Sequence, residues 1–267
     1  MLRALYSASS GMRAQQLNLD TISNNLANVN TNGFKKNRVD FQDLLYRTIQ
    51  EPGLANTSGQ MTPTGIQVGH GVRAAATPVD FTQGSLKETT NPLDLAIEGE
   101  GFFMVELPDS TIAYTRDGSF KMDAQGYLVT NNGYYVLDEG LAPIYISEDP
   151  VKNIGVASDG MISVLFPGED VPEEIAQIGM TRFPNPTGLD KVGKNLYRAT
   201  EAAGWPVEGI AEEEGMGSIV QGFLEMSNVQ IVVEMVDMIT AQRAYEINSK
   251  AITTSDEMLQ LANNLKR

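Results

Sequence analysis

Residues 188–195 come closest in this sequence to a phosphate-binding pattern. The run GLDKVGKN has the glycine and lysine spacing of a P-loop, in which backbone amides and a lysine hold nucleotide phosphates. Asn195 stands where a P-loop has the hydroxyl that binds magnesium, and a strand-like run follows at 196–200. A P-loop must open a helix, because the helix N-terminus holds the phosphate. The segment therefore predicts no nucleotide site.

The other residues capable of chemistry are isolated from one another. His70 is the only histidine and the chain has no cysteine, which excludes two-histidine metal motifs, disulfides and thiol catalysis. The run GEGFF at 99–103 lacks the third glycine and the helix of a dinucleotide fingerprint. Adjacent carboxylates at 138–139, 148–149 and 169–170 are typical of solvated loops in a chain with 34 acidic residues. We expect no enzyme, no cofactor and no bound metal.

Composition indicates a folded protein of one or two domains, with 267 residues, 42% hydrophobic and 20% charged. The net charge of −15 is uneven, because residues 1–50 hold six Lys/Arg against three Asp/Glu and the remainder carries −18. That sign argues against nucleic acid as a partner. The N-terminus is too short and polar for a signal-peptide core, and no apolar run approaches the roughly 18 residues of a membrane span.

The closing stretch, residues 227–265, keeps one helical pattern for longer than any other part of the chain. Ser227 followed by Gln230 has the form of a capping box at a helix start. A helix of this length, without Gly or Pro, points to a coiled coil or a helical assembly. Its apolar or small residues recur three or four apart: Val229, Val232, Val236, Thr240, Ala244, Ile247, Ala251, Thr254, Met258, Leu261 and Leu265.

The N-terminal segment, residues 1–33, is the natural partner for that helix. It repeats the same spacing and is expected to end at Asn32-Gly33, since Gly adopts the left-handed C-cap conformation without steric cost. We expect the two helices to pair as a coiled coil; the alternative is that each covers a face of the middle domain. The repeating residues are Leu2, Leu5, Ser9, Met12, Gln16, Leu19, Ile22, Leu26 and Val29.

Between the helices the sequence predicts an α+β protein with an antiparallel β domain. Residues 34–78 lose the helical pattern and become rich in Pro, Gly, Thr, Ser and Asn, which indicates an extended connecting or hairpin region. Residues 79–206 form the β domain, and 207–226 a return linker. The pairs Asp117-Gly118, Asn132-Gly133 and Asp159-Gly160 favour tight hairpins. Strand-like runs lie at 93–97, 102–105, 112–115, 127–129, 134–137, 144–146, 162–166 and 196–198.

Several longer runs together resemble one known family. They are SNNLANVNTNGF at 23–34, NPLDLAIEGEGFF at 91–103, YTRDGSF at 114–120, GYLVT at 126–130, SNV at 227–229 and QRAYE at 242–246. In these runs, which span the whole chain, it resembles the rod and hook family of the bacterial flagellum. The length and the run LLYRTIQEPG at 44–53 are most similar to the distal part of the rod. The proximal rod proteins and the much longer hook protein fit less well.

The resemblance implies a structural role. In this family the terminal helices pair and line the inner tube of a helical filament, with the β domain outside and the extended region joining neighbouring subunits. Members leave the cell through the flagellar type III export apparatus, without a cleavable signal peptide. The implied function is a drive shaft from periplasm to outer membrane. The implied partners are copies of itself, proximal rod proteins, hook or hook-junction protein, the surrounding rings and the export apparatus.

We expect the subunit contacts on the two helices and in the hairpin region. Small residues such as Ala251 in the closing stripe suit close packing against several helices. A rival interpretation is an enzyme or carbohydrate-binding module with a β domain, whose terminal helices only dimerise. The expected contact residues are Leu5, Met12, Leu19, Ile22, Asn25, Leu26, Asn28, Val29, Tyr46, Pro52, Val229, Val232, Val236, Ile247, Ala251, Met258, Leu261 and Leu265.

Overall fold

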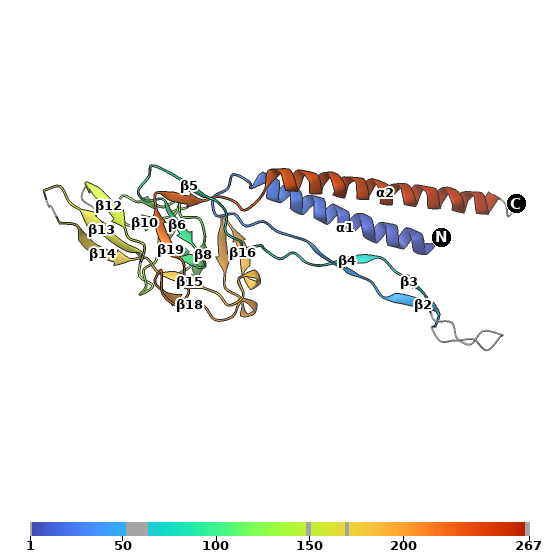
Figure 1. Ribbon diagram of the computed structural model, residues 1–267, viewed down its shortest axis with the longest axis horizontal. Helices are drawn as coiled ribbons and strands as arrows, with labels where there is room; N and C mark the ends of the chain where they lie inside the picture. The colour runs from blue at the N-terminus through green and yellow to red at the C-terminus, as the bar shows by residue number, and fades with distance from the viewer. Residues whose placement is uncertain (1, 52–63, 148–150, 169–170, 265–267) are drawn as a thin grey trace. The chain divides into compact units, whose positions relative to one another are not determined.

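The computed structural model describes residues 2–51, 64–147, 151–168 and 171–264. The chain divides into two compact units (Figure 1). The first, the helical unit, comprises Met1–Ala27, Asn37–Val79 and Gln230–Arg267; the second, the β domain, comprises Asn28–Lys36 and Asp80–Val229. Two of the expected contact residues, Pro52 and Leu265, lie outside the described residues.

The net charge belongs entirely to one of these units. The helical unit holds nine Lys/Arg and nine Asp/Glu, so its formal charge is zero. The β domain holds ten Lys/Arg and 25 Asp/Glu, which gives −15, the value for the whole chain. Copies of the helical unit can therefore approach one another without net repulsion, whereas copies of the β domain repel.

Two long helices dominate the helical unit, as the sequence predicts. α1 spans Leu2–Ala27 and α2 spans Ile231–Asn264, and the two lie side by side (Figure 1). α1 ends before the expected Asn32-Gly33 stop. α2 begins after the expected capping box, because the carbonyl of Gln230 accepts its first bond, from Glu234 N at 3.0 Å. Ser227 instead closes a local turn, its Oγ accepting from Val229 N at 3.3 Å.

A thin antiparallel ribbon completes the helical unit. β1 (Asp40–Asp43) pairs with β4 (Val72–Ala76), and β2 (Tyr46–Gln50) pairs with β3 (Ile66–Gly69). Just before β4 the ribbon passes close to α1 at Gly71, whose φ is +111°. A Cβ there would lie 2.1 Å from the Ser10 Oγ, so only glycine allows this approach.

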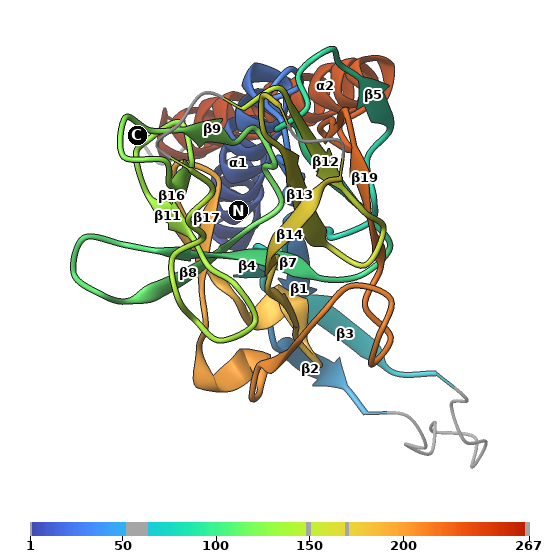
Figure 2. The ribbon, with the colours of Figure 1, turned by 90° about the vertical axis from the view of Figure 1, so that its left-hand side faces the viewer.

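The β domain is antiparallel in every strand pair described, as predicted. β7, β8, β11 and β17 belong to its largest sheet, β12, β13 and β14 form a second one (Figure 2), and two shorter pairs join β5 with β20 and β6 with β19. The strands are β5 Leu86–Glu88, β6 Leu95–Glu98, β7 Phe102–Glu106, β8 Ile112–Thr115, β9 Lys121–Met122, β10 Leu128–Val129, β11 Tyr135–Val136, β12 Asn153–Val156, β13 Met161–Leu165, β14 Glu173–Gln177, β15 Met180–Arg182, β16 Asp190–Gly193, β17 Leu196–Arg198, β18 Val207–Gly209, β19 Ser218–Gln221 and β20 Phe223–Glu225.

The core of the β domain lies on both faces of β7. Successive strand residues point to opposite faces, so Phe103 and Val105 join the larger hydrophobic cluster while Phe102 and Met104 join the smaller one. Ring pairs anchor each side, with Phe103 edge-on to Phe120 at 5.1 Å between centroids. This two-sided burial explains why β7 appears in the sequence as a continuous apolar run.

Two parts of the β domain differ from expectation. The segment 207–226, predicted as a return linker, contains β18, β19 and β20, which pair with β15, β6 and β5. The predicted run 144–146 forms only an isolated bridge between Tyr127 and Tyr145.

The P-loop-like residues 188–195 begin at the last residue of a short 3₁₀ turn, Pro186–Gly188. They continue through β16 and the turn of the β16–β17 hairpin. The strand β17 therefore follows them, as the sequence indicates.

Candidate assembly surface

The two helices contact each other in an antiparallel arrangement with a constant register. Asn25 of α1 bonds to Glu234 of α2, and Gly11 of α1 lies against Asn248 of α2. The two contacts are 14 residues apart on each helix, from 11 to 25 and from 234 to 248. A Cβ on Gly11 would lie 3.0 Å from the Asn248 amide nitrogen, so the helices approach closely here.

Asn25 holds three segments of the helical unit together. Its Nδ2 donates to the Asn37 carbonyl at 2.9 Å and to the Glu234 carboxylate at 3.2 Å, and its Oδ1 accepts from Asn37 N at 2.9 Å. Asn25 is 2% exposed and Glu234 6%. The side chain expected at a subunit contact thus lies inside the chain's own fold, where it joins α1, α2 and the segment that leads to the ribbon.

Replacing Asn25 by Asp is expected to loosen the helical unit by about 1–3 kcal/mol, because the introduced carboxylate cannot donate to Glu234 and repels it. Amide hydrogen exchange in α1 and α2 should accelerate accordingly. Asn131→Asp, at an exposed position, is the control. Equal exchange in the two variants would contradict this role for Asn25.

α2 presents one face to α1 and leaves a second one open. The covered face includes Glu234 and Ala241, both buried, with Met238 and Ile252 half-buried. Within α2, the apolar stripe predicted from the sequence lies on another face and is exposed except at Ala244, which is half-buried, so α1 leaves most of it uncovered. We call this exposed set the outer stripe: Val232, Val236, Ile247, Met258 and Leu261, which are 52% to 75% exposed, and Ala251, also exposed.

The other expected contact residues have varied surroundings. Ile22 and Val229 are buried, and Tyr46 is exposed on β2 of the ribbon. The other expected contact residues on α1 are half-buried. Two further expected contact residues, which follow α1 and belong to the β domain, are also half-buried. These half-buried residues are Leu5, Met12, Leu19, Leu26, Asn28 and Val29.

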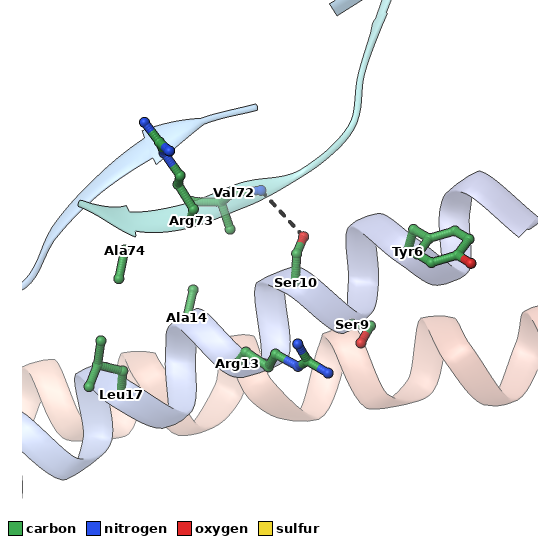
Figure 3. A pocket seen from close by; sticks show the side chains of 9 residues that line it. All are labelled: Tyr6, Ser9, Ser10, Arg13, Ala14, Leu17, Val72, Arg73 and Ala74. Atoms are coloured by element: carbon green, nitrogen blue, oxygen red, sulfur yellow. Dashed lines mark hydrogen bonds between the residues drawn. The ribbon is translucent and has the colours of Figure 1, made fainter. Parts of the chain in front are cut away.

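A groove runs between α1 and β4 in the helical unit (Figure 3). It encloses about 510 Å³. Ser10, Ala14 and Leu17 line it from α1, and Val72 and Ala74 from β4. The Ser10 Oγ accepts from Val72 N at 3.3 Å and so ties the two walls together. Arginine occurs on both walls, and none of the described residues that line the groove is acidic.

A buried ionic cluster, which the sequence does not reveal, lies in the β domain. The Lys35 ammonium contacts the Glu225 carboxylate at 2.5 Å, and Arg116 contacts its other oxygen at 3.5 Å. The side chains of Lys35 and Glu225 are fully buried. Burial lowers the pKa of Lys35 and of Arg116, and in both cases Glu225 opposes the shift. The Gly33 amide also donates to the Glu225 carbonyl at 2.8 Å, so the entry and exit of this domain are joined.

The residues considered for chemistry do not assemble into a reactive site. His70 is exposed beside β3, and the Asp138 carboxylate accepts from Ala142 N at 2.8 Å within a loop. The carboxylate pairs at 148–149 and 169–170 lie outside the described residues. In the described part of the chain, no three potential His, Cys, Asp or Glu ligands gather at one point. Of the helices described, neither is long and apolar enough to cross a membrane.

Comparison with known proteins matches both ends and the centre of the chain to flagellar families. Residues 5–35 match the family "Flagella basal body rod protein", and residues 96–164 match "Flagellar hook protein FlgE/F/G D1 domain". Residues 220–265 match "Flagellar basal body rod FlgEFG protein C-terminal". These matches include α1, the core strands and the outer stripe.

Individual relatives align along their whole length. The "Flagellar basal-body rod protein FlgG" of Borreliella burgdorferi is 53% identical, with 100% of both chains covered. The protein of the same name from Caulobacter vibrioides is 43% identical over 99% of this chain and 100% of its own. The "Flagellar hook-basal body complex protein FlhP" of Bacillus subtilis is 33% identical over both full lengths. The chain therefore belongs to the flagellar basal-body rod protein family and is a structural rod subunit.

Proposed function

We propose that the chain is the distal rod subunit and that its copies assemble into a rigid helical tube. The outer stripe on α2 is the observation on which this rests. Its apolar side chains, from Val232 to Leu261, stay exposed in the single chain along most of the helix. A contiguous apolar face of this kind marks an interaction site, because burying it against neighbouring molecules removes apolar surface from water.

The pairing of α1 and α2 is proposed to be a coiled coil that lines the channel of the tube. Two features support it. The helix contacts recur after 14 residues on both helices, which equals two heptads. Gly11 permits a close approach of the helix axes, so that a compact pair can stand beside further pairs.

A helical polymer needs two different patches that meet on neighbouring copies, since identical patches close into dimers. The outer stripe and the exposed ribbon around Tyr46 supply such different patches on one chain. The ribbon is proposed to join neighbouring subunits, and the assembled shaft to transmit motor torque while export substrates pass through its channel.

The distal position is supported by the greater identity to the FlgG proteins than to FlhP, 53% against 33%. The run at 44–53 favours the same position. A proximal place in the rod is the alternative. The proposed partners are proximal rod proteins, hook or hook-junction protein, the periplasmic and outer-membrane rings and the export apparatus. The proposed location is the rod between periplasm and outer membrane.

Purified full-length chain should form hollow tubes as its concentration rises, because the apolar outer stripe is covered only in the polymer. Negative-stain electron microscopy of a concentration series, with sedimentation to measure the polymer fraction, tests this. Compact dimers that persist at every concentration would contradict the proposal and favour a helix-dimerised binding module.

A further inference from the structure

We propose that the groove between α1 and β4 receives the C-terminal end of α2 from a second copy of the chain. The inference rests on the proposed function and deepens it, because it names one of the contacts between subunits. The groove and the helix end are different surfaces of one chain. Their union is therefore a head-to-tail contact that can repeat without closing.

The groove is open to a side chain from outside. Ala14, which is buried, and Leu17, Val72 and Ala74 give it apolar walls, and its volume of about 510 Å³ lies within the range of ordinary binding sites. α1 stands between the groove and the α2 of the same chain (Figure 3). The chain's own α2 therefore packs on α1 without filling the groove.

Among the described residues, the end of α2 extends beyond α1. The register of Asn25 with Glu234 and of Gly11 with Asn248 places residue 2, where α1 begins, opposite residue 257. The last turns of α2, residues 258–264, consequently run past the start of α1. Met258 and Leu261 are exposed on these turns and have the size and polarity that the groove accepts.

Charge favours the same pairing. Arg13 on α1 and Arg73 on β4 flank the groove, and its lining contains no acidic residue from the described part of the chain. The described partner of the Arg73 guanidinium is the neutral amide of Gln42 at 3.1 Å, which leaves the positive charge uncompensated. In α2, the two charged residues between 251 and 264, Asp256 and Glu257, are acidic, and the basic residues Lys266 and Arg267 follow later in the sequence. Arginine–carboxylate pairs beside an apolar contact fix orientation as well as partner.

Disulfide trapping tests the contact directly, because the chain contains no cysteine of its own. The variant Ala74→Cys with Leu261→Cys is allowed to polymerise and is then oxidised. We expect a ladder of covalently linked multimers on a denaturing gel. The matched control, Ala74→Cys with Met235→Cys, places the second thiol near the other end of α2, at an exposed position outside the outer stripe, and should polymerise without a covalent ladder. Tubes with no ladder, or the same ladder in both variants, would overturn the groove contact while leaving the rod function intact.

Charge reversal provides an independent measurement. Arg13→Glu with Arg73→Glu, and separately Asp256→Lys with Glu257→Lys, should each raise the critical concentration for polymerisation about ten-fold or more. All four reversals together should return it to within about three-fold of the parent. Circular dichroism checks that each variant keeps its helices. Reversals without effect, or without rescue, overturn the groove contact, and a parent that forms no tubes overturns both it and the proposed function.

Discussion

Replacing Glu225 by Gln should lower the free energy of unfolding of the β domain by about 3–5 kcal/mol, because it leaves two buried cations without a counter-charge. The Glu225 carboxylate accepts from Lys35 at 2.5 Å and from the Gly84 amide at 2.9 Å, and it contacts Arg116 at 3.5 Å. Gln keeps an acceptor oxygen and nearly the same volume. The decrease in the free energy of unfolding is therefore due to the missing negative charge and not to a cavity.

A matched substitution exists on the surface of the same domain. Glu100 pairs with Arg182 at 2.8 Å, with the Glu100 side chain 71% and the Arg182 side chain 42% exposed, and Glu100→Gln should change stability by less than about 1 kcal/mol. Urea unfolding followed by near-ultraviolet circular dichroism of the buried Tyr114 and Tyr197 would compare them. The single tryptophan, Trp205, is 90% exposed and makes a poor probe of this core. Equal effects at the two sites would refute a structural role for the buried cluster.

Replacing Ile247 by Lys should suppress polymerisation while leaving the single chain folded. Ile247 is 69% exposed in the outer stripe, so the monomer loses little. If the stripe becomes buried between copies, the change removes about 1.5–3 kcal/mol of apolar burial per subunit. The critical concentration should then rise about 10- to 150-fold. Sedimentation of polymer and electron microscopy would measure the effect.

The control for that variant is Val171→Lys, which puts the same charge at an equally exposed apolar position in the β domain. It should polymerise like the parent, because Val171 is outside the helical unit. Loss of polymer in both variants would point to net charge rather than to the stripe. Normal tubes from Ile247→Lys would remove the outer stripe from the assembly.

Much of the fold follows from local pattern. A helical repeat without Gly or Pro predicts α2, and the Asn132-Gly133 and Asp159-Gly160 pairs correctly predict the hairpins β10–β11 and β12–β13. The third predicted hairpin, at Asp117-Gly118, is wrong, because β8 pairs with β7 and β17 and β9 pairs with β10. The strands between 207 and 226 escape prediction, because each has three or four residues and pairs with β15, β6 or β5, far away in sequence. Their stability comes from tertiary partners rather than from local propensity.

The surface of α2 shows a different limit of sequence reasoning. The repeat from Val232 to Leu261 correctly marks an apolar face, but periodicity does not say whether that face meets the same chain or another one. The face that meets α1 includes polar and small residues, among them Glu234, Ala241 and Asn248. A search for a repeat of apolar residues does not select them. The Lys35–Glu225 pair is equally hidden, since 190 residues separate its members.

The division of charge between the two units has a consequence for any filament of this chain. Every added copy would contribute −15 to the β domains and nothing to the helical units. Such a filament is a polyelectrolyte, whose mobile counterions gather around the β domains within about 8–10 Å at ordinary salt. Ionic strength then determines how strongly neighbouring β domains repel one another. The helix contacts depend instead on the release of water from apolar surface. The packing of the β domains is therefore sensitive to the salt concentration, and the helix contacts are sensitive to the hydrophobic effect.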